Sequence, residues 1–221
     1  MAAIEPPTQR TWLERWSPIG GLLFIAGLIV VFAATGDSGD TIAEVIDYAE
    51  DESGWIDFTG AFALASLLLV GWFVGGLYAR LRRFGAAVES VLALVGGVAF
   101  TLLFFLALTI WTAPVSELDG EDDAALQQLH AAEYLSIEDI GWITLGGAGV
   151  GAGLMIIASS LAALRSRAAP SWAGWVGVAL GVIALATVAF FGIFAWMLWI
   201  LVASVAMLVR RSETPAAAPR A

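Results

Sequence analysis

The chain contains no cysteine, no lysine and a single histidine among its 221 residues, and only 14% of its residues are charged. Without cysteine it can form no disulfide, no thiolate nucleophile and no cysteine-ligated metal site. Without lysine it can form no Schiff base, which excludes retinal-type pigments and lysine-based covalent catalysis. These absences remove several classes of enzyme and cofactor protein before any motif is considered.

The motifs of other enzyme classes are missing as well. No Gly-x-Ser-x-Gly is accompanied by a membrane histidine, and no His-Glu-x-x-His or Walker loop is present. His130 is followed three residues later by Glu133, which offers two groups from one helical face, whereas a metal site needs three or four. We therefore interpret His130 as a surface residue. We expect no enzyme activity, no catalytic, cofactor-binding or metal-binding residues, and no cofactor.

Long apolar runs are what the sequence has in abundance. Sixty per cent of the residues are apolar, and they come in runs, not in the alternating or helical stripes of a water-soluble domain. The 38 residues from Trp172 to Val209 carry no charge. As one helix they would measure about 57 Å, twice the ~30 Å hydrocarbon core, so they must form two spans with a reversal near Phe191-Gly192.

We predict an all-α polytopic membrane bundle of six transmembrane helices with short amphipathic outer helices. Ser17-Pro18 reads as the N-cap and first turn of the first span, because proline is favoured at the first helical position. A cleaved signal peptide is the alternative for this segment, but the apolar run is long for one. The four spans before Trp172 are expected at about 17–35, 58–81, 86–113 and 140–164.

Positive and negative charges are segregated along the chain. All ten basic residues are arginines, which flank the apolar runs or lie in the terminal tails. Sixteen of the twenty acidic residues fall in 36–57 and 114–139, which contain no arginine; the others are Glu5, Glu14, Glu89 and Glu213. Cytoplasmic loops are rich in Lys and Arg. This predicts a plasma-membrane protein with cytoplasmic tails at 1–16 and 210–221, a transmembrane domain at 17–209 and the acidic segments 36–57 and 114–139 outside.

The two acidic segments are expected to be ordered. Thr41 and Glu44 have the spacing of a capping box, and Ile42, Val45, Ile46 and Ala49 then recur at helical spacing. Residues 121–135 read as a similar short helix with Leu126, Leu129 and Tyr134 on one side, and Ser136 would start the fourth span. Carboxylates such as Glu121, Asp122 and Asp123 could concentrate cations at a pore mouth, although such blocks usually only solvate a surface.

The expected spans contain one acidic residue, Glu89, close to the arginines that precede it. We predict an interfacial position for Glu89, paired with Arg82 and Arg83. Trp55, Trp111, Trp142 and Trp196 are expected in an aromatic belt at the outer helix ends. Trp72 and Trp199 lie deeper, where they either fill the core or line a pocket.

Small residues are frequent in the spans. Residues 146–153 contain five glycines, with further Gly-xxx-Gly pairs at Gly71/Gly75 and Gly177/Gly181. Such pairs let helix backbones approach closely, so we expect the fourth span at the centre of the bundle or against a partner helix. A nucleic-acid partner is not expected, because no basic cluster exceeds three residues. Lipid is the expected environment, with other membrane subunits on the glycine-rich faces.

The helical segment Thr41–Asp51, the turn at Tyr78–Arg83 and the segment Trp172–Trp175 together resemble a widespread group of six-span membrane proteins of unknown function from high-GC Gram-positive bacteria. The resemblance implies the six-span topology and no catalytic residues. The sequence thus favours a non-catalytic scaffold or accessory subunit. The alternatives are a transporter or channel for a cation or small amphiphile, and a lipid- or ligand-binding membrane sensor that holds its ligand in the acidic segments or at the deep tryptophans.

Overall fold

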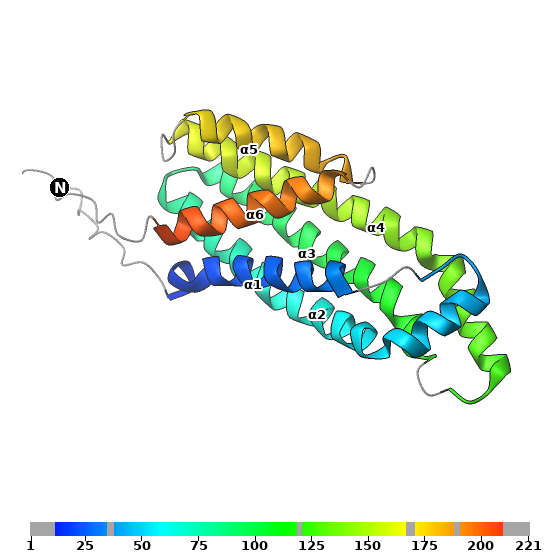
Figure 1. The fold of residues 1–221 in the computed structure, drawn as a ribbon. Coiled ribbons are helices and arrows are strands. Elements are labelled where there is room, and N and C mark those ends of the chain that lie inside the picture. The colour runs from blue at the N-terminus through cyan, green and yellow to red at the C-terminus, as the bar shows by residue number, and fades with distance from the viewer. Residues whose placement is uncertain (1–11, 35–37, 119–120, 167–170, 188–190, 210–221) are drawn as a thin grey trace, which may run out of the picture.

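The protein is a bundle of α-helices (Figure 1). The computed structural model describes residues 12–34, 38–118, 121–166, 171–187 and 191–209, and within these ranges the chain forms helices and no strand. The helices are α1 (Trp12–Ala34), α2 (Ile42–Arg83), α3 (Ala87–Ser116), α4 (Ala124–Arg165), α5 (Ser171–Ala184) and α6 (Phe191–Val209). The predicted all-α fold is therefore confirmed.

Five of the described helices are long and apolar enough to cross a membrane. The exception is α5, whose 14 residues measure about 21 Å, less than a typical hydrocarbon core. The predicted division of 172–209 into two helices is correct, and the reversal lies between Ala184 and Phe191, slightly earlier than expected. In this sense the chain is a helical membrane protein. We call the end of the bundle that holds Arg80, Arg82, Arg83 and Arg165 the arginine end.

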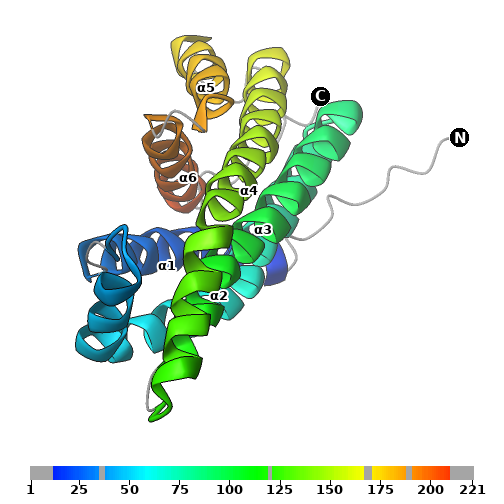
Figure 2. The same cartoon turned by 90° about the vertical axis from the view of Figure 1, so that its right-hand side faces the viewer.

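α4 is the central helix of the bundle, as its glycines predict. Of its apolar window 61% is buried, against 44% for each of the other four long helices. It contacts α2, α3, α5 and α6, and Figure 2 shows α5 and α6 on one side of it and α3 on the other. A Cβ atom on Gly151 would lie 2.6 Å from the backbone nitrogen of Phe100 in α3. Only glycine allows this approach, so α3 and α4 touch through their backbones.

The core of the bundle is built on aromatic rings from four helices. Phe24 of α1 lies 5.2 Å from Phe104 of α3, and Trp196 of α6 lies 5.0 Å from Phe100, measured between ring centroids. Each such edge-to-face pair adds about 0.5–1.5 kcal/mol beyond simple burial. The expected belt position of Trp196 is therefore wrong: the side chain is fully buried, because the face of α6 that carries it points to the bundle axis and not to the interface.

A smaller second core lies at the end of the bundle opposite the arginines. Residues 42–52 of α2, the end of α3 and residues 124–139 of α4 form this unit, which we call the distal lobe (Figure 1). Its core consists of Val45, Ala49, Ile56, Val115, Leu118, Ala131 and Tyr134. The predicted acidic segments are thus folded against each other and against α3.

The predicted capping box at the start of α2 is confirmed. The backbone N–H of Glu44 donates to the Thr41 hydroxyl at 3.3 Å, and the backbone N–H of Thr41 donates to the Glu44 carboxylate at 3.0 Å. The Thr41 hydroxyl and the neighbouring backbone N–H groups hold the pKa of the Glu44 carboxyl below its usual range. The helix then bends at Glu52, whose φ of −115° and ψ of 16° are non-helical, and continues to Arg83.

Three expected details of the helix ends are wrong. α1 begins at Trp12, so Ser17 and Pro18 lie inside the helix and not at its start. α4 runs unbroken through Ser136, whose hydroxyl donates to the Glu133 carbonyl within the same helix. Of the residues expected on the apolar side of 121–135, Tyr134 is buried in the lobe beside Ala131, whereas Leu126 and Leu129 are exposed. Tertiary packing of Ala131 and Tyr134 keeps this part of α4 helical, which a local capping pattern does not reveal.

The glycine contact between α3 and α4 should be a main determinant of stability. Replacing Gly151 by Ala forces two backbones apart, so we expect the free energy of unfolding in detergent to fall by about 1–3 kcal/mol. Gly71→Ala is the matched control, because nothing lies within 4 Å of the position that its Cβ would occupy, and it should leave stability unchanged or slightly higher. Thermal unfolding of the two variants measures the difference, and equal melting temperatures would contradict the contact.

Candidate functional site

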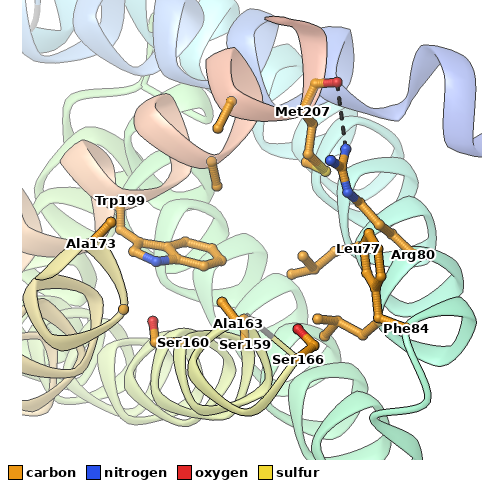
Figure 3. Close-up of a pocket in the computed structure, with 14 residues that line it drawn as sticks. Leu77, Arg80, Phe84, Ser159, Ser160, Ala163, Ser166, Ala173, Trp199 and Met207 are labelled. Carbon is orange, nitrogen blue, oxygen red and sulfur yellow. Dashed lines mark hydrogen bonds between the residues drawn. The ribbon is translucent and has the colours of Figure 1, made fainter. Parts of the chain in front are cut away.

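A cavity of about 300 Å³ lies at the arginine end, between α2, α4, α5 and α6 (Figure 3). Each of three helices contributes residues that recur at helical spacing and so share one face. These are Leu77, Arg80 and Leu81 of α2 with Phe84 directly after it; Ser159, Ser160 and Ala163 of α4 with Ser166 directly after it; and Trp199, Ala203, Ala206 and Met207 of α6. Ala173 and Gly174 of α5 close the wall.

The cavity exists because small side chains meet where four helices converge. Ala163, Ala173, Ala203 and Gly174 face a space that larger residues would fill. At the same time, Gly177 and Gly181 bring α5 close to α4, because a Cβ on Gly177 would collide with the Ser160 side chain. The volume lies at the lower end of the range for small-molecule sites, about 300–1,000 Å³, and the lining is mostly apolar with a few polar groups, as in such sites.

The end of the cavity farther from the arginines carries two polar groups. The hydroxyl of Ser160 and the indole nitrogen of Trp199 both lie beside Gly177, and Figure 3 shows them turned toward one another from α4 and α6. Both residues are at least nine-tenths buried, with exposures of 6% and 9%, and both line the cavity. A buried polar group of this kind gains by binding a ligand or water atom.

The opposite end of the cavity carries a positive charge. The Arg80 guanidinium donates to the backbone carbonyl of Met207 at 3.5 Å (Figure 3) and lies 6.0 Å from the centre of the Phe84 ring. Met207 is in the last turn of α6, where carbonyl groups have no partner within the helix. The hydroxyl of Ser166, at the end of α4, donates to the Ala162 carbonyl. Its oxygen can also accept a hydrogen bond.

A second cavity of about 250 Å³ adjoins the first, and Phe84 and Ser166 line both. Glu89 lines this second space and forms an ion pair with Arg165 at the end of α4. Glu89 is buried, whereas the Arg165 side chain is exposed. The sequence predicted Arg82 and Arg83 as partners, and the Arg165 contact was missed because it joins residues 76 positions apart in the chain. Arg82 donates to the Tyr78 hydroxyl on its own helix.

The residues of the distal lobe that could have formed a site have structural roles. The Asp123 carboxylate caps α4 by accepting from the Ala125 backbone at 2.8 Å, and the Glu121 carboxylate accepts from the Asp123 backbone at 3.0 Å. His130 lies 4.0 Å from Glu133. In the part of the chain that the structure describes, no three or more His, Asp or Glu side chains come together as metal ligands would.

Of the two deep tryptophans, Trp199 lines the larger cavity, as one of the two interpretations of the sequence allowed. Arg80, Ser160 and Ser166 were not singled out. Their common position is visible only once α2, α4 and α6 are assembled, although the helical spacing of Leu77, Arg80, Leu81 and Phe84 was readable on α2 alone.

Fold and cavity together define a helical membrane protein with a small, mostly apolar site near one end of the bundle. Comparisons with protein-family models, with curated proteins and with solved structures find no match to this chain.

The ion pair between Glu89 and Arg165 should couple α3 to α4. A double-mutant cycle with Glu89→Gln and Arg165→Gln is expected to give an interaction energy of about 0.5–3 kcal/mol, because either single change removes the pair and the second change then costs less. Chemical unfolding in detergent supplies the four free energies. The control cycle replaces Arg165→Gln by Arg82→Gln, at the same end of the bundle, and should be additive. Additivity in both cycles would show that the pair contributes nothing.

Proposed function

We propose that this protein is a non-catalytic membrane protein that binds a small amphiphile in the cavity at the arginine end. The observation that carries the proposal is the combination of a mostly apolar space of about 300 Å³ with two polar groups that line it, on the buried residues Ser160 and Trp199. An apolar chain could fill such a space, and an oxygen on it could accept from both groups.

The same proposal includes the orientation of the chain. Arginines are retained on the cytoplasmic side of membranes, and Arg80, Arg82, Arg83 and Arg165 lie at one end of the bundle. We therefore place this end and both chain termini in the cytoplasm of a plasma membrane, and the distal lobe outside. The cavity then lies at the depth of the cytoplasmic leaflet.

Ligand binding takes precedence here over the scaffold role that the sequence favours. That role rested on glycine-rich faces, and the structure uses the glycines of α4 within the chain: Gly151 contacts α3, whereas Gly149 and Gly153 lie against α5 and the turn that follows it. Transport rested on Glu121, Asp122 and Asp123. Glu121 and Asp123 stabilise the start of α4, so a role in cation entry needs support from elsewhere.

Ligand retention tests the proposal directly. The full-length protein, extracted from native membranes in mild detergent, should retain one amphiphile per chain, detected by native mass spectrometry. Ala163→Leu fills the cavity and should abolish retention, while Ala179→Leu, on the exposed face of α5, should not. Retention that is equal in both variants, or absent from the unmodified protein after supplying lipid extract, would contradict the proposal.

An accessory-subunit role remains the second candidate because one glycine face is open. A Cβ on Gly71 of α2 would have no neighbour within 4 Å, and Leu64 and Leu68 on the same face are 62% and 77% exposed. A partner helix could approach α2 here. Gly71→Leu should then release a co-purifying membrane protein without lowering thermal stability, whereas an unchanged set of co-purifying proteins would argue against this surface.

A further inference from the structure

The polar groups of the cavity are arranged in an order that specifies the kind of amphiphile. Arg80 and Ser166 lie at the end of the cavity near the helix termini, and Ser160 and Trp199 lie deeper in the bundle (Figure 3). Along α4, Ser160 and Ser166 are six residues apart, which corresponds to about 9 Å. Between the two ends the walls are apolar, with Leu77, Leu81 and Ala163 among the lining residues.

Positively charged groups gather at the end of the cavity that lies nearest the helix termini, where an anion could bind. The C-termini of α2, α4 and α6 meet at this end, and each contributes a partial negative charge of about half a unit. Positive charge at the same end comes from four guanidinium groups and from the N-termini of α3 and α5, which carry partial positive charges. The guanidinium groups belong to Arg80, Arg82, Arg83 and Arg165. Glu89, which lines the adjoining space, is paired with Arg165. Arg80 brings a guanidinium to this end of the larger cavity.

Of these four arginines, Arg80 lines the larger cavity. Its guanidinium carries five N–H donors in a planar fork, which matches carboxylate and phosphate groups. The contacts to the Met207 carbonyl and the Phe84 ring fix the guanidinium on the wall between α2 and α6. The charge is therefore held in place before a ligand arrives, which lowers the entropic cost of binding.

We infer that the ligand is an anionic amphiphile whose carboxylate or phosphate binds Arg80, whose apolar chain fills the cavity, and whose deeper oxygen accepts hydrogen bonds from Ser160 and Trp199. This inference rests on the proposed function and adds the chemical class of the ligand. The anion can come from a membrane phospholipid or from a free fatty acid, and these share the chemistry that Arg80 recognises.

The test compares headgroups on one acyl chain. Purified full-length protein in neutral detergent is titrated with dioleoyl phosphatidylglycerol, with dioleoyl phosphatidylcholine and with oleate, and bound molecules are counted by native mass spectrometry. We expect the anionic probes to bind at least about tenfold more tightly than phosphatidylcholine, since a hydrogen bond to a charged group is worth about 1.5–3 kcal/mol. Preference for oleate alone identifies a free fatty acid as the source, and preference for phosphatidylglycerol identifies a phospholipid.

Variants of the two polar ends assign the preference to its residues. Arg80→Gln should remove most of the preference for anions and should weaken phosphatidylcholine less, because its choline offsets the charge of its phosphate. Arg80→Lys should retain part of the preference, and Arg82→Gln, which leaves the cavity lining intact, should retain all of it. Ser160→Ala combined with Trp199→Phe should weaken binding of both phospholipids, whose ester oxygens can accept from these groups, and leave oleate unchanged, because oleate has no oxygen besides its carboxylate. Melting temperatures confirm that each variant is folded.

The outcomes separate the inference from the proposed function. If Arg80→Gln binds the anionic probes as tightly as the unmodified protein does, or if the unmodified protein binds phosphatidylcholine as tightly as the anionic probes, the assignment of an anionic ligand is overturned while binding in the cavity stands. If no probe binds, or if Ala163→Leu binds all of them normally, the proposed function itself fails.

Discussion

The cost of placing a charge in hydrocarbon is the constraint on which the rest of this structure depends. A charged side chain at the centre of a membrane helix costs about 2.5–3.5 kcal/mol on insertion scales, and the chain obeys this by concentrating carboxylates in 36–57 and 114–139 and arginines at the opposite end. Glu89 is an acidic residue within a predicted span, near the arginine end, and its charge is compensated by an ion pair with Arg165. Helices follow from the same constraint, because lipid offers no partner to an open backbone.

Packing within the bundle then depends on small residues. The hydrophobic effect does not drive helices to associate in lipid, so close approach and van der Waals contact must hold them together. Gly151 against α3 and Gly181 against α4 bring three helices together. Where α2 and α6 join them, alanines face one another and leave the cavity unfilled. The same abundance of small residues that stabilises the bundle thus also creates its cavity.

Most of the fold, and little of the site, could be predicted from the sequence. Apolar runs and charge segregation give the helices and their order, and the Thr41–Glu44 capping box was recognisable because its signal is local. The continuity of α4 through Ser136 was not, since it depends on Ala131 and Tyr134 packing in the distal lobe. Nor could the burial of Trp196 or the pairing of Glu89 with Arg165 be foreseen, because both depend on residues far away in the chain.

The cavity illustrates the same limit. Trp199 could be marked as a deep aromatic residue, but two polar groups become a site only when α4 and α6 bring them to the same place. Arg80 reads in the sequence as one more cytoplasmic arginine. In the structure it lines the cavity on the wall shared by α2 and α6, which gives a topological signal a second, chemical role.

The orientation of the bundle underlies both the segregation of charge and the depth of the cavity, and accessibility labelling measures it most directly. The chain lacks cysteine, so single cysteines can be introduced as Glu133→Cys in the distal lobe and Arg82→Cys at the arginine end, both at exposed positions. In intact cells a membrane-impermeant maleimide should label the first variant, and it should label the second only after permeabilisation. The reverse pattern would contradict the account.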